Sequence, residues 1–405
     1  MSTSSRRRQL FALAILSVAL LLAPGAAQAT AGGTPVAWGC GAGNDFGQCT
    51  VPGRLSGVTA IAAGGYHSLA LRSDGTVVAW GCGGAYNFGQ CNVPSGLSGV
   101  TAIAAGYAHS LSLKPDGTVA AWGCGGAYNF GQCDVPSRLA GVIAIAAGVG
   151  QSLALKRDGT VVAWGCAGGA NDGQCNVPAG LSGVTAIAAG YAHSLALRND
   201  GTVVTWGCGA GYDFGQCTVP SDLVGVTAIA AGASHSLALK SDGTVVAWGC
   251  RLDFGQCRVP SGLAGVTGIS AGGAHSLALK RDGTVVAWGC GGGSDDGQCN
   301  LPKGVANATA ISAAVSRSVT GGFGSHSLAL VAPAPARCKV PNVVGRRLAL
   351  AKRTIAQRHC RTGAAHYVYS AKRAKGIVIA QSRRPGRVLP ASSKINLVVS
   401  RGRKR

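Results

Sequence analysis

The residues best suited to chemistry in this chain are its cysteines, because most of them recur in pairs. Fourteen of the 16 cysteines fall into seven pairs that are nine residues apart, or seven in one case. Metal binding is the alternative reading, but the spacing is wide for a zinc site and no histidine accompanies the paired cysteines. We therefore predict seven local disulfides, each closing one loop. The pairs are Cys40 with Cys49, Cys82 with Cys91, Cys124 with Cys133, Cys166 with Cys175, Cys208 with Cys217, Cys250 with Cys257, and Cys290 with Cys299.

Histidines also recur, always immediately before a serine, which raises the question of a nucleophilic or metal site. They stand at positions 67, 109, 193, 235, 275 and 326, and Gln151 takes the equivalent place once. Histidines spread evenly along a repeat cannot converge on one metal, and no acidic residue accompanies the His-Ser pairs as a catalytic triad requires. We expect a structural role, with each histidine bonded to backbone, and we expect no enzyme activity, metal or cofactor.

These residues belong to a repeat whose landmark is Trp-Gly-Cys followed by Gly-Gln-Cys. All seven tryptophans of the chain occur in it, spaced 42 residues apart five times and 40 once. One unit, such as residues 76–117, contains an Ala-rich segment, an alternating segment, a β-branched segment and a fourth segment around Val-Pro. Asp-Gly separates the second segment from the third and indicates a two-residue hairpin. Four short strands repeated at this period predict a β-propeller.

The number of repeats predicts how the ring closes. There are seven Trp segments, seven Ala-rich segments and seven Ser-Leu-Ala-Leu-type segments, but only six Asp-Gly turns. We therefore expect an all-β, seven-bladed propeller closed by its N-terminal strand, with residues 34–38 pairing with residues 327–330. The slim Ala-rich strand should lie innermost, and each tryptophan should fill the gap between two blades.

The two ends of the chain differ from the repeats. Residues 1–29 have an arginine run, a short apolar stretch and a small-residue cleavage site. We therefore predict a cleaved signal peptide, and the alternative is a retained membrane anchor. The propeller should span 30–332, and 333–336 read as a stiff Pro/Ala linker. Residues 337–405 hold 19 Lys and Arg and no acid, out of a net charge of +22. This small α+β domain should contain a helix with Leu348, Ala351, Ile355 and Ala356 at core spacing, strands near 365–369, 376–381 and 394–399, and a disulfide between Cys338 and Cys360.

The repeat motif WGC…FGQC…VP…GLSGVTAIAAG…HSLALK.DGTVVAWG resembles the regulator-of-chromosome-condensation repeat over about residues 34–331. It looks most like the bacterial version in secreted propeller-type β-lactamase inhibitor proteins. This resemblance implies a seven-bladed propeller that binds proteins without catalysis. Eukaryotic relatives include GTPase exchange factors, which makes an exchange-factor-like activity a less favoured expectation by analogy.

The C-terminal region resembles a PASTA domain. The matching motifs are Val-Pro-Asn-Val-Val-Gly at 340–345, Gly-Ile-Val-Ile-Ala-Gln-Ser at 376–382 and Pro385-Gly386. The resemblance implies a cell-wall-associated setting and muropeptide binding. The high positive charge independently suits anionic partners, and we name as polyanion-binding candidates Arg346, Arg347, Arg383, Arg384 and Arg387.

One face of the expected propeller varies between repeats, and loops on a rigid scaffold are where binding residues usually lie. This face combines the connections between first and second strands with the cysteine-bounded loops. Exposed tyrosines are frequent anchors at protein interfaces. The binding-face candidates are Tyr66, Tyr86, Tyr107, Tyr128, Tyr191 and Tyr212, together with Asp45, Asp172, Asp213, Asp253, Asp295 and Asp296. Phe46, Phe88, Phe130, Phe214 and Phe254 should be packing residues, and basic residues beside the opposite turns should give the two faces different signs.

Taken together, the sequence predicts a secreted or wall-associated bacterial binding protein. The propeller face would recognise a protein partner, including as an inhibitor, and the tail would associate with anionic wall polymer or peptidoglycan. The alternative is a muropeptide- or carbohydrate-binding surface protein in which the propeller is a scaffold. We expect a monomer and no nucleic-acid partner.

Overall fold

The computed structural model describes residues 32–41, 45–53, 55–168, 171–209, 211–291, 295–315, 326–333 and 337–404. The expected signal peptide and most of the expected linker lie outside these residues. The chain divides into two compact units, residues 1–332 and 333–405. None of the described helices is long and apolar enough to cross a membrane.

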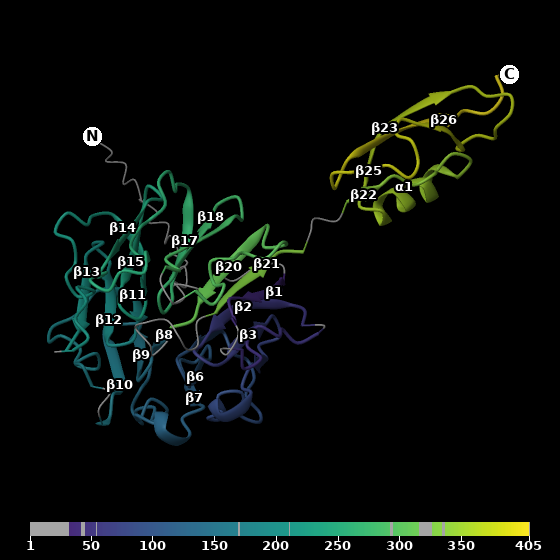
Figure 1. Ribbon diagram of the computed structural model, residues 1–405. Helices are drawn as coiled ribbons and strands as arrows, with labels where there is room; N and C mark the ends of the chain where they lie inside the picture. Colours follow the sequence, from purple (N-terminus) through teal and green to yellow (C-terminus); the bar gives the residue numbers. More distant parts are fainter. Residues whose placement is uncertain are drawn as a thin grey trace, which may run out of the picture. The chain divides into compact units, whose positions relative to one another are not determined.

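The larger unit consists of three-stranded antiparallel sheets made from consecutive stretches of chain (Figure 1). We number seven sheets in chain order. They are β2 (Val58–Ala63), β3 (Ser68–Arg72) and β4 (Val77–Trp80); β5 (Ala102–Ala105), β6 (Ser110–Leu113) and β7 (Val119–Trp122); β8 (Val142–Ala147), β9 (Gln151–Lys156) and β10 (Val161–Gly165); β11 (Val184–Ala189), β12 (His193–Arg198) and β13 (Val203–Gly207); β14 (Val226–Ala231), β15 (Ser236–Lys240) and β16 (Val245–Trp248); β17 (Val266–Ala271), β18 (Ser276–Lys280) and β19 (Val285–Trp288); and β20 (Ala308–Ala313), β21 (Ser327–Val331) and β1 (Thr34–Trp38).

The seventh sheet joins the two ends of the unit. Strand β1 pairs antiparallel with β21, with Thr34 opposite Val331 and Trp38 opposite Ser327. The predicted pairing of residues 34–38 with residues 327–330 is therefore confirmed. The first strand of the first sheet, β2, also contacts β20 and β21 of this seventh sheet.

Each sheet has three strands rather than the four that the sequence predicted. The segment expected to form the fourth strand bonds within itself: the amide of Asp134 donates to Gly131 O at 2.9 Å and that of Val135 to Cys133 O at 2.9 Å. Pro136 follows and has no N–H to offer a ladder. Local turns thus satisfy the backbone amides that a fourth strand would have paired, and the proline has no amide hydrogen to pair.

The turn between the second and third strands is also longer than predicted. In the first sheet, the amide of Arg72 donates to Thr76 O at 2.9 Å and that of Gly75 to Arg72 O at 3.0 Å. This pattern encloses three residues, Ser73 to Gly75, and Gly75 has φ +78°. A three-residue hairpin loop of this kind requires a left-handed residue at its end, which explains the recurring Asp-Gly.

The first strands lie innermost, as predicted. Residues from the first strand of all seven sheets, together with Val315, line one cavity of about 80 Å³. Its lining is mostly alanine, because strands this close together leave no room for larger side chains. Ser270 and Ser312 are its polar members, and they accept hydrogen bonds from the amides of Ala313 and Ala63, each at 3.0 Å.

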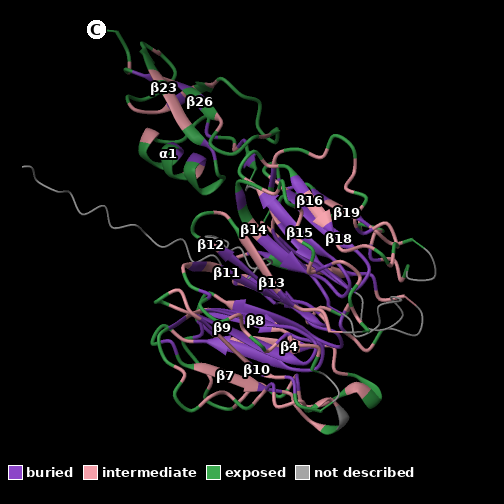
Figure 2. Cartoon of the chain, turned by 90° about the vertical axis from the view of Figure 1, so that its left-hand side faces the viewer, coloured by how far each residue is buried: buried purple, intermediate pink, exposed green. Residues whose placement is uncertain are grey.

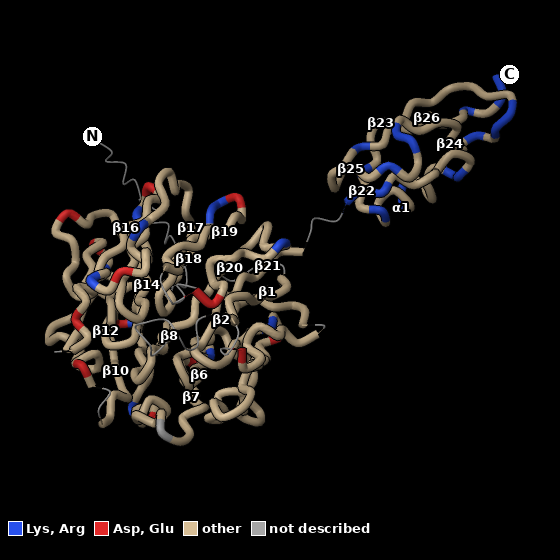
Figure 3. Tube along the Cα trace, in the orientation of Figure 1, with Lys and Arg blue, Asp and Glu red and all other residues tan. Residues whose placement is uncertain are grey.

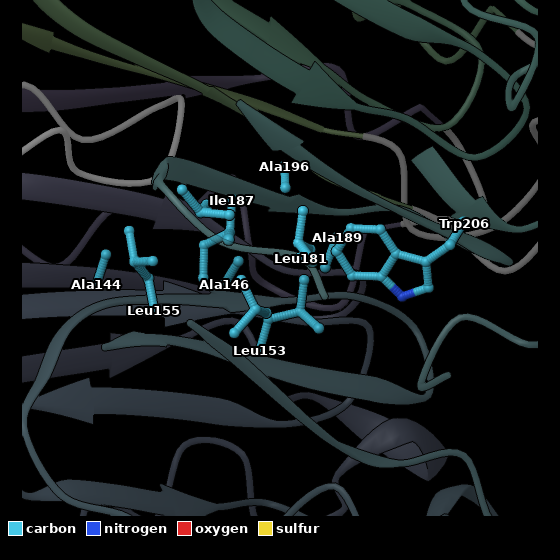
Figure 4. Close-up of a cluster of buried hydrophobic side chains, with 11 residues drawn as sticks. Ala144, Ala146, Leu153, Leu155, Leu181, Ile187, Ala189, Ala196 and Trp206 are labelled. Carbon is cyan, nitrogen blue, oxygen red and sulfur yellow. The ribbon is translucent and has the colours of Figure 1, made fainter. Parts of the chain in front are cut away.

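The tryptophans fill the space between neighbouring sheets, which confirms their predicted position. Trp206, at the end of β13, packs with Leu153 and Leu155 of the third sheet and Ile187 of the fourth (Figure 4). Burying one such ring removes roughly 200 Å² of apolar surface from water, and at about 25 cal/mol per Å² this gives about 5 kcal/mol as an upper estimate. Strands are mostly buried and the connecting loops exposed (Figure 2).

The smaller unit has its own core. Its elements are β22 (Cys338–Lys339), α1 (Leu348–Gln357), β23 (Arg361–Val368), β24 (Val378–Gln381), β25 (Val388–Leu389) and β26 (Lys394–Ser400). Strand β26 is central, parallel to β23 and antiparallel to β24. Ala351 and Ile355 of α1 are buried against the sheet, but Ala356 is exposed, contrary to prediction, because it lies about 100° around the helix from Ile355.

Candidate binding face

The predicted disulfides are all formed. Each of the seven loop pairs is joined, with Cα atoms 6.0 to 6.3 Å apart, and Cys338 is joined to Cys360 in the smaller unit. The described residues include no free cysteine. In chain order the loop disulfides join Cys40 to Cys49, Cys82 to Cys91, Cys124 to Cys133, Cys166 to Cys175, Cys208 to Cys217, Cys250 to Cys257, and Cys290 to Cys299.

The seven disulfide loops share one internal design. In the first sheet, Asn87 Oδ1 accepts from the amide of Gly89 at 3.0 Å, which forms an Asx turn. Gln90 then folds back, accepting from the amide of Phe88 at 2.6 Å and donating to Tyr86 O at 2.6 Å. The disulfide thus closes a loop whose backbone is already held by the side chains of its own residues.

The same glutamine joins one sheet to the next. Its main-chain oxygen accepts from Trp122 Nε1 at 2.9 Å and from Ser110 Oγ at 3.1 Å, and both donors belong to the second sheet. Gln90 is fully buried. No role is predicted from the sequence for this glutamine, although Gly-Gln-Cys occurs in every repeat.

The recurring histidines join the sheets as well. Nε2 of His67 lies 2.9 Å from Ser110 Oγ of the next sheet, and the other five histidines make the equivalent contact at 2.8 to 3.1 Å. Gln151 substitutes by donating to Gly190 O and His193 O. The predicted structural role therefore holds, but the partner is a serine of the neighbouring sheet rather than backbone.

The network assigns the tautomer of these histidines. Ser110 donates to Gln90 O, so its oxygen accepts from Nε2–H of His67, and Nδ1 is the unprotonated nitrogen. None of the described residues bonds Nδ1 of any of the six histidines. Burial lowers the pKa of His67 to about 3. Each His-Ser pair is fully buried and neutral, so it cannot reach a dissolved substrate.

The junction between the seventh and first sheets uses the same bonds as the others. His326 Nε2 lies 2.8 Å from Ser68 Oγ, and Trp80 Nε1 donates to Gln48 O at 3.0 Å. Ser68 Oγ also donates to Gln48 O at 3.2 Å. The two ends of the unit are thus held by the hydrogen bonds that hold neighbouring sheets elsewhere.

An aromatic cluster occupies part of the face formed by the disulfide loops and the His-containing connections, which we call the loop face. Tyr66 stacks on Tyr86 with ring centroids 4.4 Å apart, and Phe46 lies 4.6 Å from Tyr86. The contacts continue from Tyr66 to Tyr107 at 4.7 Å and from Tyr107 to Tyr128 at 5.4 Å. The cluster comprises Phe46, Tyr66, Tyr86, Phe88, Tyr107 and Tyr128, from the seventh, first and second sheets.

Two of the tyrosine candidates are not exposed, contrary to prediction. Tyr66 is 1% and Tyr107 3% exposed, and their hydroxyl groups bond each other. Burial raises the pKa of Tyr66 to about 12 and also raises that of Tyr107. These two rings form the floor of the cluster. Tyr86 and Tyr128 are half-buried, so part of each ring faces solvent above that floor.

The remaining tyrosine candidates form a pair in the fourth sheet, and Tyr191 also packs against the aromatic cluster. Tyr191 and Tyr212 meet edge to face with centroids 4.9 Å apart. At the position of Tyr107 and Tyr191, the fifth and sixth sheets carry Ala233 and Gly273. The connections between the first and second strands are therefore aromatic in the first, second and fourth sheets and carry small residues in the fifth and sixth.

Most of the aspartate candidates serve the turns of their own loops. Asp45, Asp213, Asp253 and Asp295 occupy the Asx-turn position, each accepting from the amide of the glycine two residues on. Asp253 also pairs with Arg258 at 2.7 Å. Asp172 and Asp296 stand where other loops have phenylalanine, and burial raises the pKa of Asp172.

The opposite turns are less positive than predicted. Lysines beside these turns pair with the aspartate of the same turn, as in Lys156–Asp158 at 2.9 Å and Lys240–Asp242 at 3.7 Å. Each turn that carries a cation thus also carries an anion. Exposed pairs of this kind contribute little stability.

The polyanion-binding candidates of the smaller unit separate into two groups. Residues 340–347 run beside 377–387, so Arg347 lies opposite Ile377 at one end. At the other end the amide of Gly386 donates to Val340 O at 2.8 Å, which places Arg383, Arg384 and Arg387 there. All five arginines are exposed, and Figure 3 shows Lys and Arg over this unit without any Asp or Glu. Among the described residues of the chain, no three His, Cys, Asp or Glu gather as a metal site would require.

Two family models match the chain. The regulator of chromosome condensation (RCC1) repeat matches residues 58–90, 100–132, 184–216, 226–256 and 266–298. The PASTA domain matches residues 339–401. Among curated proteins, none matches the chain significantly.

Solved structures resemble the chain at low identity. Prp20p from Saccharomyces cerevisiae, described with its binding properties to Gsp1p and histones, is 21% identical with a TM-score of 0.60, covering 76% of this chain and 93% of that one. Yeast RCC1 (Prp20) bound to Kap60 is 19% identical with a TM-score of 0.58, covering 82% and 97%. Human WBSCR16 is 17% identical with a TM-score of 0.52, covering 74% and 98%. At these identities the likeness shows a shared fold.

Proposed function

We propose that this chain, which contains five RCC1 repeats and a C-terminal PASTA domain, is a secreted or wall-associated bacterial binding protein rather than an enzyme. Eight disulfides suit an oxidising, extracytoplasmic compartment. The composition of residues 1–29, with arginines before a short apolar stretch, supports export as a cleaved signal peptide. The buried, neutral His-Ser pairs support a non-catalytic role.

The larger unit is, in this proposal, a closed seven-bladed propeller. Two observations support closure: β1 completes the sheet of β20 and β21, and His326 bonds Ser68 as each other histidine bonds the next sheet. A ring closed in this way hides the edges of its first and last sheets. It also holds the loop face rigid, which lowers the entropic cost of binding a partner.

The aromatic cluster is the proposed contact surface for a protein partner. The observation that carries this proposal is the departure from repetition. Tyr86 and Tyr128 are half-buried and lie over a buried aromatic floor on neighbouring sheets, whereas the fifth and sixth sheets have no tyrosine in the equivalent loops and connections. The loops that carry them have the same sequence, Cys-Gly-Gly-Ala-Tyr-Asn-Phe-Gly-Gln-Cys, at 82–91 and 124–133. Tyrosines held by neighbouring rings are rigid anchors of the kind that dominate protein interfaces.

The smaller unit would hold the protein at the cell wall. Its PASTA match supports association with peptidoglycan, and its excess of positive charge supports association with anionic wall polymer. This match also favours the second candidate function, a muropeptide-binding surface protein in which the propeller is only a scaffold. The two candidates differ in whether the loop face has a partner of its own.

Capture from the culture medium and wall fraction of the source cells separates the two. The full chain serves as bait, the captured protein is identified and purified, and its Kd is measured by calorimetry. Changing both Tyr86 and Tyr128 to Ser should weaken binding by roughly 30-fold or more, as expected for two interface anchors.

Tyr212→Ser is the matched control, because Tyr212 occupies the equivalent loop of the fourth sheet. This variant should bind like the parent, and thermal melting of each variant checks that it is folded. Equal weakening by both changes, or retention of all partners through residues 337–405 alone, would favour the scaffold function instead.

A further inference from the structure

We propose that one end of the smaller unit binds the surface of an anionic lipid bilayer. This end, which we call the lipid tip, comprises residues 367–375 and 401–403. It is distinct from the group of Arg383, Arg384 and Arg387 at the other end of the unit. The proposal does not depend on the propeller having a protein partner.

Backbone hydrogen bonds bring the parts of the lipid tip together. The amide of Arg401 donates to Val368 O at 2.7 Å, and that of Ser370 donates to Gly402 O at 2.9 Å. The amide of Gly376 donates to Ser400 O at 2.8 Å, and Ser400 Oγ donates to Arg373 O at 2.8 Å. The end of β23, the connection to β24 and the chain beyond β26 therefore form one ordered surface.

This surface exposes large apolar side chains in succession. Tyr367 is 49%, Val368 42% and Tyr369 55% exposed. Tyr367 and Val368 are consecutive in β23 and so point to opposite faces, whereas Tyr367 and Tyr369 are two residues apart and point to the same side. Large exposed apolar side chains that point to the same side mark an interaction site. Tyrosine is also the residue that prefers the level of lipid headgroups, since its ring is apolar and its hydroxyl is polar.

Cations surround the exposed tyrosines. Lys372, Arg373 and Lys375 follow them directly and are exposed, and Arg401 and Arg403 lie on the neighbouring segment. The Arg401 guanidinium carbon lies 5.7 Å from the centroid of the Tyr369 ring. Figure 3 shows Lys and Arg gathered beside the C-terminus, and residues 337–405 contain no acid that would repel an anionic surface.

The combination favours a bilayer over a soluble polyanion. A soluble polyanion would be held by the cations alone and would leave the rings of Tyr367 and Tyr369 in water. A bilayer surface offers anionic headgroups for the cations and an apolar boundary for these side chains. Two weak signals of this kind act together, as stable peripheral attachment requires.

Vesicle co-sedimentation of the full chain tests the proposal. The chain should sediment with vesicles of mixed phosphatidylglycerol and phosphatidylcholine but not with phosphatidylcholine alone. Changing both Arg401 and Arg403 to Gln should weaken binding by roughly 30-fold, from the attraction of two cations near an anionic surface. Changing both Tyr367 and Tyr369 to Ser should weaken it by about tenfold, through loss of apolar burial.

Two controls keep the test specific. Changing both Arg384 and Arg387 to Gln removes the same charge from the other end of the unit and should leave vesicle binding within about twofold. Thermal melting confirms that each variant is folded. Equal losses from both charge variants with no loss from the tyrosine variant would overturn the proposal, as would binding to inorganic polyphosphate in the absence of any vesicle binding.

Discussion

At the residue scale, the repeat is organised by a glutamine, a tryptophan and a histidine that each connect neighbouring sheets. Gln90 shapes its own loop through its side chain and receives Trp122 and Ser110 of the next sheet on its main-chain oxygen. The position of the tryptophans between neighbouring sheets could be predicted from the sequence, because they recur at a fixed period and have large side chains. The glutamine was missed because an uncharged amide next to cysteine gives no chemical signal, and only the repetition of Gly-Gln-Cys pointed to it.

The buried histidines should make the protein sensitive to acid. Burial lowers the pKa to about 3 for His67, His109, His193, His235 and His326 and to about 4 for His275. In the unfolded chain these side chains titrate near 6.5. Their contribution to the free energy of unfolding is therefore complete above pH 6.5. It is lost progressively as the pH falls toward 3, because the unfolded chain binds protons that the folded chain does not. At pH 5.5 the free energy of unfolding should be lower than at pH 7 by about 1 kcal/mol per histidine.

Guanidinium unfolding at pH 7 and pH 5.5 measures this loss, and Gln151 provides the control. Because the third sheet already uses glutamine at this position, we expect His109→Gln to fold and to lose less stability on acidification than the parent. If the variant and the parent show the same pH dependence, the histidines do not set it.

Close packing at Gly81 gives a second prediction at this scale. Gly81 has φ +95°, and a Cβ there would lie 2.5 Å from Gln48 Cα of the adjoining sheet. Gly81→Ala combines backbone strain with overpacking. It should therefore lower the free energy of unfolding by about 2 kcal/mol more than backbone strain alone would. Gly96 has φ +78° with nothing within 4 Å, so Gly96→Ala measures the strain by itself, at about 1 to 2 kcal/mol. Equal losses in chemical denaturation would show that the contact at Gly81 is not restrictive.

At the element scale, sequence periodicity located the three strands of each sheet but also predicted a fourth strand that does not form. The segment around Pro136 looks extended in sequence, yet its amides bond to Gly131 and Cys133 within the same loop. Propensity cannot reveal this, because the competing bonds form only once the disulfide loop has turned back. The pairing of β1 with β21 was predictable, since it follows from counting turns against strands.

Removing β1 should destabilise the whole larger unit. Deleting residues 30–38 removes the strand opposite β21 and the buried Trp38, which packs with Leu277 and Ile311. Loss of the tryptophan alone should cost about 3 to 5 kcal/mol. In a closed ring the effect should spread, so hydrogen exchange in β8 and β9, far from the deletion in sequence, should also accelerate.

The control for this deletion lacks only residues 30 and 31, which precede the described residues, and it should exchange like the parent. Faster exchange confined to β20 and β21 would mean that the sheets are stable independently and that closure is not what holds them.

At the scale of the whole molecule, two units with separate cores share one chain. The smaller unit buries Val343, Ile355 and Leu397 around its own disulfide. We expect calorimetry of the full chain to show two transitions, with the isolated residues 333–405 reproducing one of them, because a domain with its own core folds alone. A single transition that neither isolated unit reproduces would show that the units stabilise each other.

The binding face was only partly predictable at this scale. The sequence indicated the variable loops and the tyrosines, since both depart from the repeat. It did not reveal that Tyr66 and Tyr107 bury each other, because 41 residues separate them and the contact depends on connections from two neighbouring sheets converging. The aspartates were misleading for a related reason: four of them are held by turn amides of their own loops.

If the partner binds the aromatic cluster, hydrogen exchange of the full chain with and without the captured partner will show it. We predict protection of the loops at 82–91 and 124–133, which carry Tyr86 and Tyr128, with little change in the equivalent loop at 250–257. Protection confined to the Asp-Gly turns on the opposite side, or to residues 337–404, would contradict the account.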